Sequence, residues 1–234
     1  MTMADYMLMV LEDETAHATQ SPMEIAELIE NRTQFVGRLR RTGKLRDSGR
    51  FRPSKEGKRV RRHGDQVAVE DGPFTEALGS YVCVKASSLE EATQLATEYP
   101  VLAADEVAVR RLVRCVLEAD KEGKPGKIFG FVVRGAAQTE EAWVKVMDRI
   151  NAESAFPSDA FLGGVRLEEP TAGRRIATRG ERRATFDGPF LESKEVIGGV
   201  FFLRMASLED AVSWAGESRF VVHGSLEIRE LWRS

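Results

Sequence analysis

Asp71-Gly72-Pro73-Phe74 is the stretch that decides the fold, because the same tetrapeptide returns 116 residues later as Asp187-Gly188-Pro189-Phe190. Around it, residues 57–76 align with residues 173–192 with nine identities in twenty positions. Three residues inserted near 193–196 then change the offset to 119, and the similarity continues into the last strand of each copy. A repeat of this length usually means two copies of one folding unit.

The period of the repeat is the length of a small domain, and is too long for a solenoid. We therefore predict two domains, residues 1–118 and 125–234, joined by an exposed linker rich in charge, glycine and proline. The composition agrees, because 42% hydrophobic and 30% charged residues are ordinary values for a globular protein.

Both copies predict the same order of elements, β-α-β-β-α-β. The first copy gives a strand at 6–11, a helix from Ser21 that ends at Gly43, a hairpin at 58–70, a strand at 79–86, a helix at 88–99 and a strand at 107–113. The second gives a strand at 128–133, a helix carrying Trp143, Val146, Met147 and Ile150, a hairpin turning at Gly180, a strand at 199–205, a helix from Ser207 and a strand at 226–232. This order is typical of the α+β ferredoxin-like plan, in which two helices cover one face of a sheet.

The uncovered sheet faces indicate how the repeats assemble. Two copies in one chain can bury these faces against each other, so we predict an intrachain pseudo-dimer with pseudo-twofold symmetry, a dimeric α/β barrel. A homodimer of the whole chain is the alternative, because pairing within the chain can leave edge strands exposed.

The sequence also indicates a location. It has no run of 18 apolar residues to span a bilayer, and residues 1–11 lack the basic and apolar regions of a signal peptide. Cys83 and Cys115 form no close-spaced motif and lie in apolar surroundings, which favours free thiols. We therefore expect a cytoplasmic protein without a membrane partner.

Further sequence features accompany the tetrapeptide, most completely in copy two. They are the glutamate that follows it (Glu76 or Glu192), the segment Lys194-Glu195-Val196-Ile197-Gly198-Gly199, the Ser-Leu-Glu-x-Ala helix starts and the strand Leu226-Glu227-Ile228-Arg229. In these features the chain resembles the YCII-related family, in its DGPF-domain branch, over residues 5–114 and 127–233. The resemblance implies a dimeric α/β barrel, here built from two repeats. It implies no specific activity, although members are often encoded beside sigma factors of the extracytoplasmic-function type, which hints at a regulatory role.

The resemblance also implies a histidine on the first helix paired with an aspartate just after the second. This chain departs from that pattern. The predicted first helices carry Asn31, Arg32 and Gln34 in copy one and Asp148, Arg149 and Asn151 in copy two, with no histidine. After the second helix, copy one has Asp105 and copy two has Gly224. These departures argue against hydrolytic or lyase chemistry based on such a pair.

The tetrapeptide has two interpretations. Structurally, Asp71 and Asp187 accept backbone hydrogen bonds in a turn whose glycine and proline set the chain direction. Functionally, each aspartate forms a carboxylate pair with Glu76 or Glu192, five residues later, as a general base or metal ligand. Copy two also keeps Lys194, so we expect any catalytic site there, with Asp187 and Glu192 as its acid–base groups.

Arginines recur at equivalent places, Arg59 with Arg175 and Arg110 with Arg229. A guanidinium on a strand can hold a carboxylate or phosphate group of a ligand through two parallel hydrogen bonds. The alternative is a structural ion pair with the nearby aspartate. The candidate ligand-binding residues are therefore Arg59, Arg175, Arg229, Asp71, Glu76 and Lys194.

The histidines give one further candidate. We place His17 in the loop after the first strand, His63 in a hairpin turn and His223 before the last strand, and no pair has metal-ligand spacing. His223 can act as a catalytic acid or base if it faces the cleft of copy two. Neither a metal site nor a cofactor is predicted, because no glycine-rich phosphate loop or other cofactor motif is recognised.

The segment 38–62 is strongly basic. It contains 12 Lys or Arg residues against Asp47 and Glu56, a net charge of +10 in a chain whose total is −3. Such a segment can attract nucleic acid, but it has few aromatic residues and matches no nucleic-acid motif. Nucleic-acid binding is therefore not favoured, and a solvated loop or contacts with acidic residues are.

Three functions remain open from the sequence. The first is binding of a small anionic ligand in a cleft between the repeats, lined by Arg175, Asp187 and Glu192. The second is an enzyme that performs acid/base chemistry on a small metabolite with the same groups. The third is an interaction module associated with a sigma factor through the basic segment. A deep cavity with close carboxylates would favour the second function over the other two.

Overall fold

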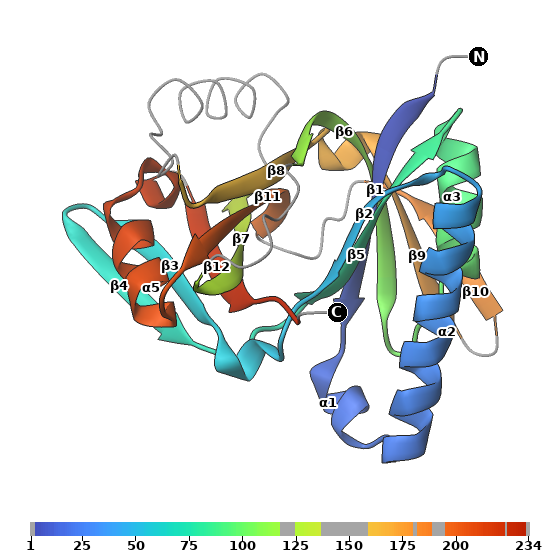
Figure 1. The fold of residues 1–234 in the computed structure, drawn as a ribbon, viewed down its shortest axis with the longest axis horizontal. Helices are drawn as coiled ribbons and strands as arrows, with labels where there is room; N and C mark the ends of the chain where they lie inside the picture. Colours follow the sequence, from blue (N-terminus) through green and yellow to red (C-terminus); the bar gives the residue numbers. More distant parts are fainter. Residues whose placement is uncertain are drawn as a thin grey trace. The chain divides into compact units, whose positions relative to one another are not determined.

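The computed structural model describes residues 3–117, 125–136, 159–179, 182–188, 195–222 and 224–232. They form an α+β structure in which antiparallel strands predominate (Figure 1). The chain divides into two compact units: unit 1 contains Met1–Arg50, Phe74–Leu112 and Pro170–Phe190, and unit 2 contains Phe51–Pro73, Val113–Glu169 and Leu191–Ser234. Each unit therefore combines most of one sequence repeat with a β-hairpin from the other. None of the helices in the described ranges is long and apolar enough to cross a membrane.

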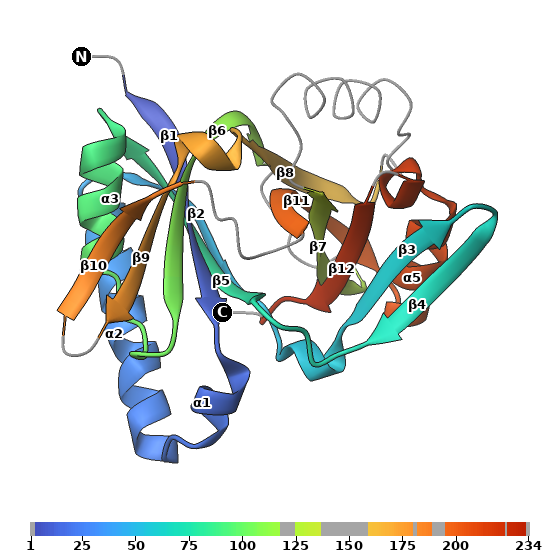
Figure 2. The same ribbon diagram turned by 180° about the vertical axis from the view of Figure 1, so that it is seen from behind.

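The sheet of unit 1 has the strand order β2-β5-β1-β6-β9-β10, with every neighbouring pair antiparallel. The strands are β1 (Ala4–Glu12), β2 (Leu45–Arg50), β5 (Ala77–Ala86), β6 (Glu106–Leu117), β9 (Arg174–Arg179) and β10 (Arg182–Asp187). The last two are the hairpin of the second repeat, and Figure 2 shows them beside β6. Unit 1 is thus completed by a segment that lies far away in the sequence.

Three helices belong to unit 1: α1 (Glu14–Ala18), α2 (Pro22–Arg41) and α3 (Leu89–Glu98). The long helix α2 begins with a capping box between Ser21 and Glu24 and is followed by Gly43 at a φ of 69°, a conformation that glycine adopts without strain. Helices α2 and α3 pack on the sheet face formed by alternate residues of β1 and β5, and the buried side chains include Leu8, Val10, Phe35, Leu39, Val82, Ala92 and Ala96.

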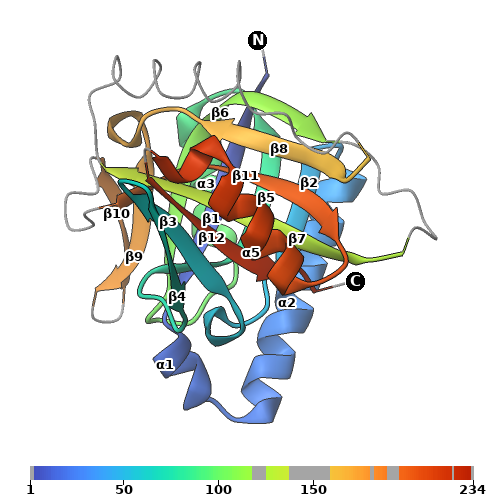
Figure 3. The same ribbon diagram turned by 90° about the vertical axis from the view of Figure 1, so that its left-hand side faces the viewer.

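The sheet of unit 2 has the order β8-β11-β7-β12-β3-β4, again antiparallel throughout. The strands are β3 (Lys58–His63), β4 (Gln66–Asp71), β7 (Lys127–Ala136), β8 (Phe161–Leu167), β11 (Glu195–Met205) and β12 (Gly224–Glu230). Helix α5 (Leu208–Glu217) lies over β12 and β3 on one face (Figure 3). Its Trp214 joins an aromatic core in which Phe131 stacks on Phe201 with ring centroids 4.9 Å apart.

Short 3-10 turns precede each hairpin and follow α5. They are η1 (Ser54–Glu56), η2 (Pro170–Ala172) and η3 (Arg219–Val222). The first two lie 116 residues apart, so the repeat extends to the turn that leads into each hairpin.

The structure confirms the α+β class and most predicted elements of copy one, and it adds three that the sequence prediction omitted: β2, β8 and α1. Strand β2 has the sequence LRDSGR, in which one apolar residue gives no alternation. Each predicted hairpin is present, but it pairs with a strand of the other repeat, β3 with β12 and β9 with β6. The helix expected around Trp143 and the hairpin turn at Gly180 lie outside the described residues.

Candidate functional site

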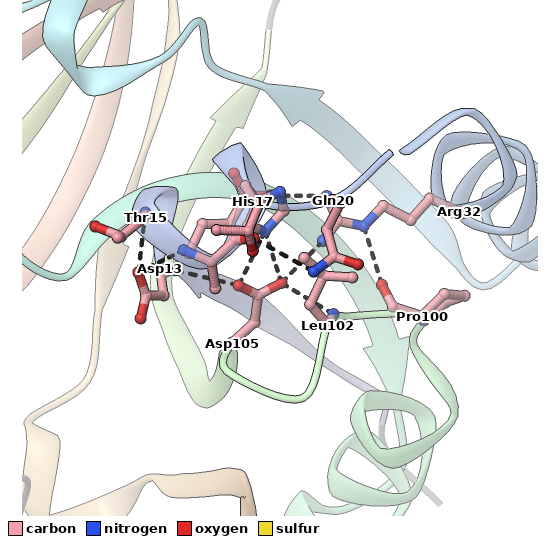
Figure 4. Close-up of polar contacts among 11 residues, drawn as sticks. Asp13, Thr15, His17, Gln20, Arg32, Pro100, Leu102 and Asp105 are labelled. Carbon is pink, nitrogen blue, oxygen red and sulfur yellow. Dashed lines mark hydrogen bonds and ion pairs between the residues drawn. The ribbon is translucent and has the colours of Figure 1, made fainter. Parts of the chain in front are cut away.

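Asp105 is the centre of a polar cluster in unit 1. It lies in the turn between α3 and β6, and it is buried, with only 1% of its surface exposed. The backbone N–H of Asp13 donates to Oδ1 and that of Leu102 donates to Oδ2, both at 3.1 Å (Figure 4). These two bonds fix both carboxylate oxygens, and they compensate part of the cost of burying the charge.

His17 contacts the same carboxylate through its imidazole ring. Its ring nitrogen Nε2 lies 3.0 Å from both Oδ1 and Oδ2 of Asp105 (Figure 4). The short helix α1 sets this geometry, because the side chain of Asp13 caps it by accepting hydrogen bonds from the N–H groups of Thr15 and Ala16. The hydrogen bond to Asp105 raises the pKa of His17 above its usual value, and the charge of Glu12 raises it further, whereas burial opposes the shift.

Arg32 connects the cluster to α2. Its Nη1 lies 2.7 Å from Oε1 of Glu12, its Nη2 lies 3.6 Å from Oδ2 of Asp105, and its Nε donates to the carbonyl oxygen of Pro100 at 2.9 Å. The guanidinium lies 5.6 Å from the ring centroid of Tyr99, a distance at which the ring face attracts a cation. Because only 6% of Arg32 is exposed, its charge is held inside the protein by these contacts.

Glu12 occupies a space that a glycine leaves free. The pairing of β1 with β5 shifts register between Val10 and Leu11, and Gly79 is the unpaired residue on β5. A Cβ atom at Gly79 would lie 2.0 Å from Cδ of Glu12, so only glycine leaves room for this carboxylate. The sequence of β5 therefore helps to place an acidic group next to Arg32.

The four side chains together favour uptake of one proton. With His17 neutral, the charges of Glu12, Asp105 and Arg32 sum to −1, and protonation of His17 brings the sum to zero. Glu12, His17 and Asp105 also place ligand atoms within 4.8 Å of one another, as a metal site does. However, Arg32 already contacts both carboxylates and His17 already bonds to Asp105, so the arrangement fits proton transfer better than cation binding.

The recurring tetrapeptide lies at the base of each hairpin. Asp71 pairs with Lys58 and Asp187 pairs with Arg174 at 3.0 Å, in each case the first residue of the hairpin, and the aspartate side chains are 76% and 85% exposed. A Cβ at Gly72 would lie 1.9 Å from the carbonyl oxygen of Ser54 in η1. In the second copy, a Cβ at Gly188 would lie 2.3 Å from the carbonyl oxygen of Pro170 in η2. The close contacts at both glycines support a structural role for the tetrapeptide, in which each aspartate forms an ion pair where backbone hydrogen bonds were predicted.

The other predicted binding residues that the structure describes have partners outside the His17 cluster. Arg59 and Arg229 contact the buried Glu227 at 3.0 and 3.1 Å, and Arg175 contacts Glu106 at 3.2 Å. Glu76 is exposed, at a φ of 53°. Glu192, Lys194 and His223 lie outside the described residues, so a catalytic site in the second copy stays a prediction.

Glu227 forms a second buried charge cluster, in unit 2. Besides Arg59 and Arg229, it contacts Nε of Arg134 at 2.9 Å. Burial alone would raise the pKa of Glu227, but the three guanidinium groups together outweigh burial and hold the pKa below its usual value. The sequence prediction had treated Arg59 and Arg229 as ligand-binding candidates. In the structure both contact an internal carboxylate, and ligand binding by them stays a prediction.

The basic segment is largely paired with acidic residues. Its ion pairs are Arg38 with Glu98, Lys44 with Glu91, Arg46 with Asp5, Arg52 with Glu56 and Glu230, Lys58 with Asp71, Arg59 with Glu227 and Arg61 with Glu70. These ion pairs support the interpretation that the positive charge of the segment contacts acidic residues of the same chain.

Sequence reasoning missed the site for an identifiable reason. It looked for a histidine on the long helix after Ser21, whereas His17 lies on the five-residue helix before it. Asp13 followed by Glu14 and Thr15 was the available signal, because an aspartate N-cap before an acidic first turn marks a helix start. The first copy therefore contains a histidine–aspartate contact, formed by a histidine that the sequence prediction had placed in a loop.

Comparison with family models gives the relationship. The model of the YCII-related domain matches residues 5–116 and, separately, residues 135–234. The two matches correspond to the two sequence repeats and together cover most of the chain. A search of curated proteins found no match. The chain thus belongs to the YCII-related family and carries its domain as two tandem copies.

Proposed function

We propose that this protein is an enzyme that performs general acid–base chemistry on a small metabolite, with His17 as the group that transfers the proton. The observation that carries the proposal is the contact of His17 Nε2 with both oxygens of the buried Asp105, at 3.0 Å each. A histidine oriented by a buried carboxylate is the arrangement that enzymes use to hold an imidazole in one tautomer. Asp105 is then a positioning residue.

The contact defines which nitrogen reacts. A carboxylate accepts hydrogen bonds and cannot donate them, so Nε2 of His17 carries the hydrogen that points at Asp105. The lone pair of the neutral ring is then on Nδ1, which is the atom that accepts a proton from a substrate. The positive charge that forms on the ring is stabilised by Asp105 and Glu12, which makes His17 a stronger base than a free imidazole.

Arg32 has a different role in the same step. By contacting Glu12 at 2.7 Å and Asp105 at 3.6 Å, it lets two carboxylates remain close together next to one imidazole. Without this cation, repulsion between the two carboxylates would push them apart, and the orientation of His17 would weaken. We infer that Arg32 holds Asp105 in the position from which it orients the ring.

The proposal also includes three expectations from the sequence: the ferredoxin-like repeat, the DGPF branch and the cytoplasmic location. The strand order β2-β5-β1-β6 with α2 and α3 on one face supports a ferredoxin-like repeat, extended by the exchanged hairpin. The repeated Asp-Gly-Pro-Phe sequence supports the DGPF branch. Cys83 and Cys115 are not joined by a disulfide, which supports the expected cytoplasmic location.

Hydrolysis of p-nitrophenyl acetate tests the proposal, because this ester reports on a basic imidazole without requiring the natural substrate. We expect H17N and D105N to lose most of the protein-dependent rate, on the order of 10²-fold or more for the loss of a positioned base. H63N is the matched control, since His63 is exposed at the end of a hairpin strand. A rate that H63N reduces and H17N leaves unchanged would contradict the proposal, as would a D187N variant that abolishes the rate.

A further inference from the structure

The segment that carries Asp105 is held by a residue from the other sequence repeat. Arg183 lies on β10, in the hairpin that the second repeat contributes to unit 1. Its Nη1 donates to the carbonyl oxygens of Thr97 at 2.6 Å and of Tyr99 at 2.9 Å. These carbonyls belong to the C-terminal end of α3, where carbonyl groups lack partners within the helix.

The two carbonyls lie at the start of the turn that presents Asp105. After Tyr99, the carbonyl of Pro100 accepts from Arg32, and the N–H of Leu102 donates to the Asp105 carboxylate. The N–H of Asp105 closes the turn on the carbonyl of Leu102 at 3.0 Å. Two arginines thus bind carbonyl groups of this turn before Leu102, Arg183 at its start and Arg32 in its middle.

The hairpin also contacts the elements that precede and follow this turn, α3 and β6. Strand β9 pairs with β6 directly after Asp105, with Ile176 opposite Val107. Ile176 is buried in the core of unit 1. At the other end of α3, Arg174 contacts Glu90 at 3.1 Å. The hairpin thus reaches both ends of α3 from a fixed position on the sheet.

The hairpin of the first repeat makes a related contact in unit 2, but from a different residue. The residue equivalent to Arg183 at the offset of 116 is Val67, which is half exposed and lies against Gly216 of α5. The carbonyl of Gly216 accepts a hydrogen bond from Arg62 on β3, at a different place in the hairpin. Each hairpin therefore donates a hydrogen bond from an arginine to the C-terminal end of the helix in its unit, and the bond from Arg183 to the carbonyl of Tyr99 extends this contact to the turn that leads to Asp105.

We propose that Arg183 is a positioning residue, through which the second repeat holds the turn 99–105 and keeps Asp105 directed at His17. This inference rests on the proposed function of the His17–Asp105 pair and extends it, because the site of the first repeat is then incomplete without the second. Burial lowers the pKa of Arg183 and the charge of Asp105 opposes that effect, so the guanidinium is within electrostatic reach of the site.

The pKa of His17, measured by NMR on the full-length protein, separates positioning from simple charge effects. Loss of the cation alone would favour protonated His17 and raise its pKa. Loss of positioning would weaken the hydrogen bond to Asp105, which is the largest cause of the raised pKa, and so lower it. We expect R183M to lower the His17 pKa by at least half of the decrease that D105N produces. The His17 resonance is identified as the one that is missing from the NMR spectrum of H17N.

R182M is the matched control, because Arg182 is the neighbouring, exposed residue on the same strand. It should leave the His17 pKa at the wild-type value. We also expect faster amide hydrogen exchange at Leu102 in R183M, because its N–H donates to the carboxylate that moves. If R183M does not fold, R183K decides the question: a lysine retains the charge but cannot reproduce the guanidinium geometry, and we expect an intermediate decrease.

The outcomes distinguish this inference from the proposed function. A His17 pKa that D105N lowers and R183M (or R183K, if R183M does not fold) leaves unchanged or raised would overturn the role of Arg183 alone. An equal decrease in R182M would also overturn it, since the effect would then belong to the hairpin in general. A His17 pKa that D105N leaves unchanged would overturn the proposed pair, and the role of Arg183 with it.

Discussion

The two units share one strand order but bury their charges at different places. In unit 1, Glu12 lies at the end of β1 and Asp105 just before β6, where α1 and α2 bring His17 and Arg32 to them. In unit 2, the buried carboxylate is Glu227, in the middle of β12. Its equivalent in unit 1 is Ala108. Ala108 pairs with Met9 on β1, and Glu227 pairs with Val132 at the equivalent position on β7.

The positions of Glu12 and Asp105 in unit 1 are occupied by glycines in unit 2. Glu12 pairs with Ala77, and the equivalent pair in unit 2 is Gly135 with Val196. Gly224 is the residue aligned with Asp105, and a Cβ there would lie 2.0 Å from the carbonyl oxygen of Arg134. An aspartate cannot replace Gly224 without moving the backbone, so unit 2 cannot reproduce the arrangement around Asp105.

The difference shows how duplication can separate two tasks. The cluster around Glu227 combines one carboxylate with guanidinium groups, which keep their charges between pH 5 and 8. The cluster around Asp105 contains a histidine, which changes charge in that range. We infer that the buried charges of unit 1 serve chemistry and those of unit 2 serve the fold.

Glu227→Gln should give the largest loss of stability. The variant has almost the same shape but leaves three guanidinium groups without the charge of their shared carboxylate. Breaking a buried ion pair on one side costs about 3–5 kcal/mol. Urea unfolding of the variant checks this. E230Q is the matched control, because the partly exposed Glu230 on the same strand contacts Lys127 and should contribute at most about 1 kcal/mol. Equal effects of the two variants would contradict the distinction between the clusters.

Gly79→Ala should have the next largest effect, and it acts on unit 1. The new Cβ would lie 2.0 Å from Cδ of Glu12, so the carboxylate must move away from Arg32. Overpacking of this kind costs about 1–3 kcal/mol. The His17 pKa should also fall, because the charge of Glu12 contributes to raising it. The test is thermal unfolding together with NMR titration of His17.

Gly37→Ala is the control for that change. Gly37 lies inside α2, where a Cβ meets the end of the Arg41 side chain at an ordinary 3.5 Å. Alanine is the better helix former, so this variant should gain up to about 1 kcal/mol. If Gly79→Ala were as well tolerated as Gly37→Ala, the space beside Glu12 would not require glycine.

These expectations show which parts of the molecule the sequence could reveal. The duplication was visible in repeated letters, and the limits of α2 were visible because Ser21 and Gly43 have side-chain or backbone properties suited to helix ends. The hairpin exchange was not visible, because the two hairpins have similar sequences and either could pair within its own repeat. His17 was missed because a five-residue helix has no periodicity to detect.

The pH dependence of stability is a smaller effect that sharpens the comparison. The pKa of His17 is raised in the folded protein, so its protonation stabilises the fold. This contribution is fully present below the unfolded pKa of about 6.5 and is lost as the pH rises through the folded pKa. The melting temperature of the wild type relative to H17N should therefore fall between slightly acidic and alkaline pH. The difference in melting temperature between the wild type and H63N should not fall in this way, because both proteins contain His17. A difference between the wild type and H17N that grows with pH would contradict the assignment to His17.

Lys44→Met should have the smallest effect of these changes. Lys44 contacts Glu91 in the first turn of α3 at 2.7 Å, and the hydrogen bonds from Lys44 and Ser87 lower the pKa of Glu91 to about 2. The equivalent residues in the second repeat are Ala160 and Asp210, so the pair is specific to unit 1. A partly exposed ion pair contributes at most about 1 kcal/mol.

Because the folded pKa of Glu91 is lowered, the contribution of the pair is present above the unfolded pKa of about 4.5 and is lost as the pH falls toward 2. Urea unfolding at pH 7 and at pH 3 should therefore show a wild-type advantage over K44M that shrinks in acid. An advantage that grows in acid would mean that Lys44 stabilises α3 by a contact other than Glu91.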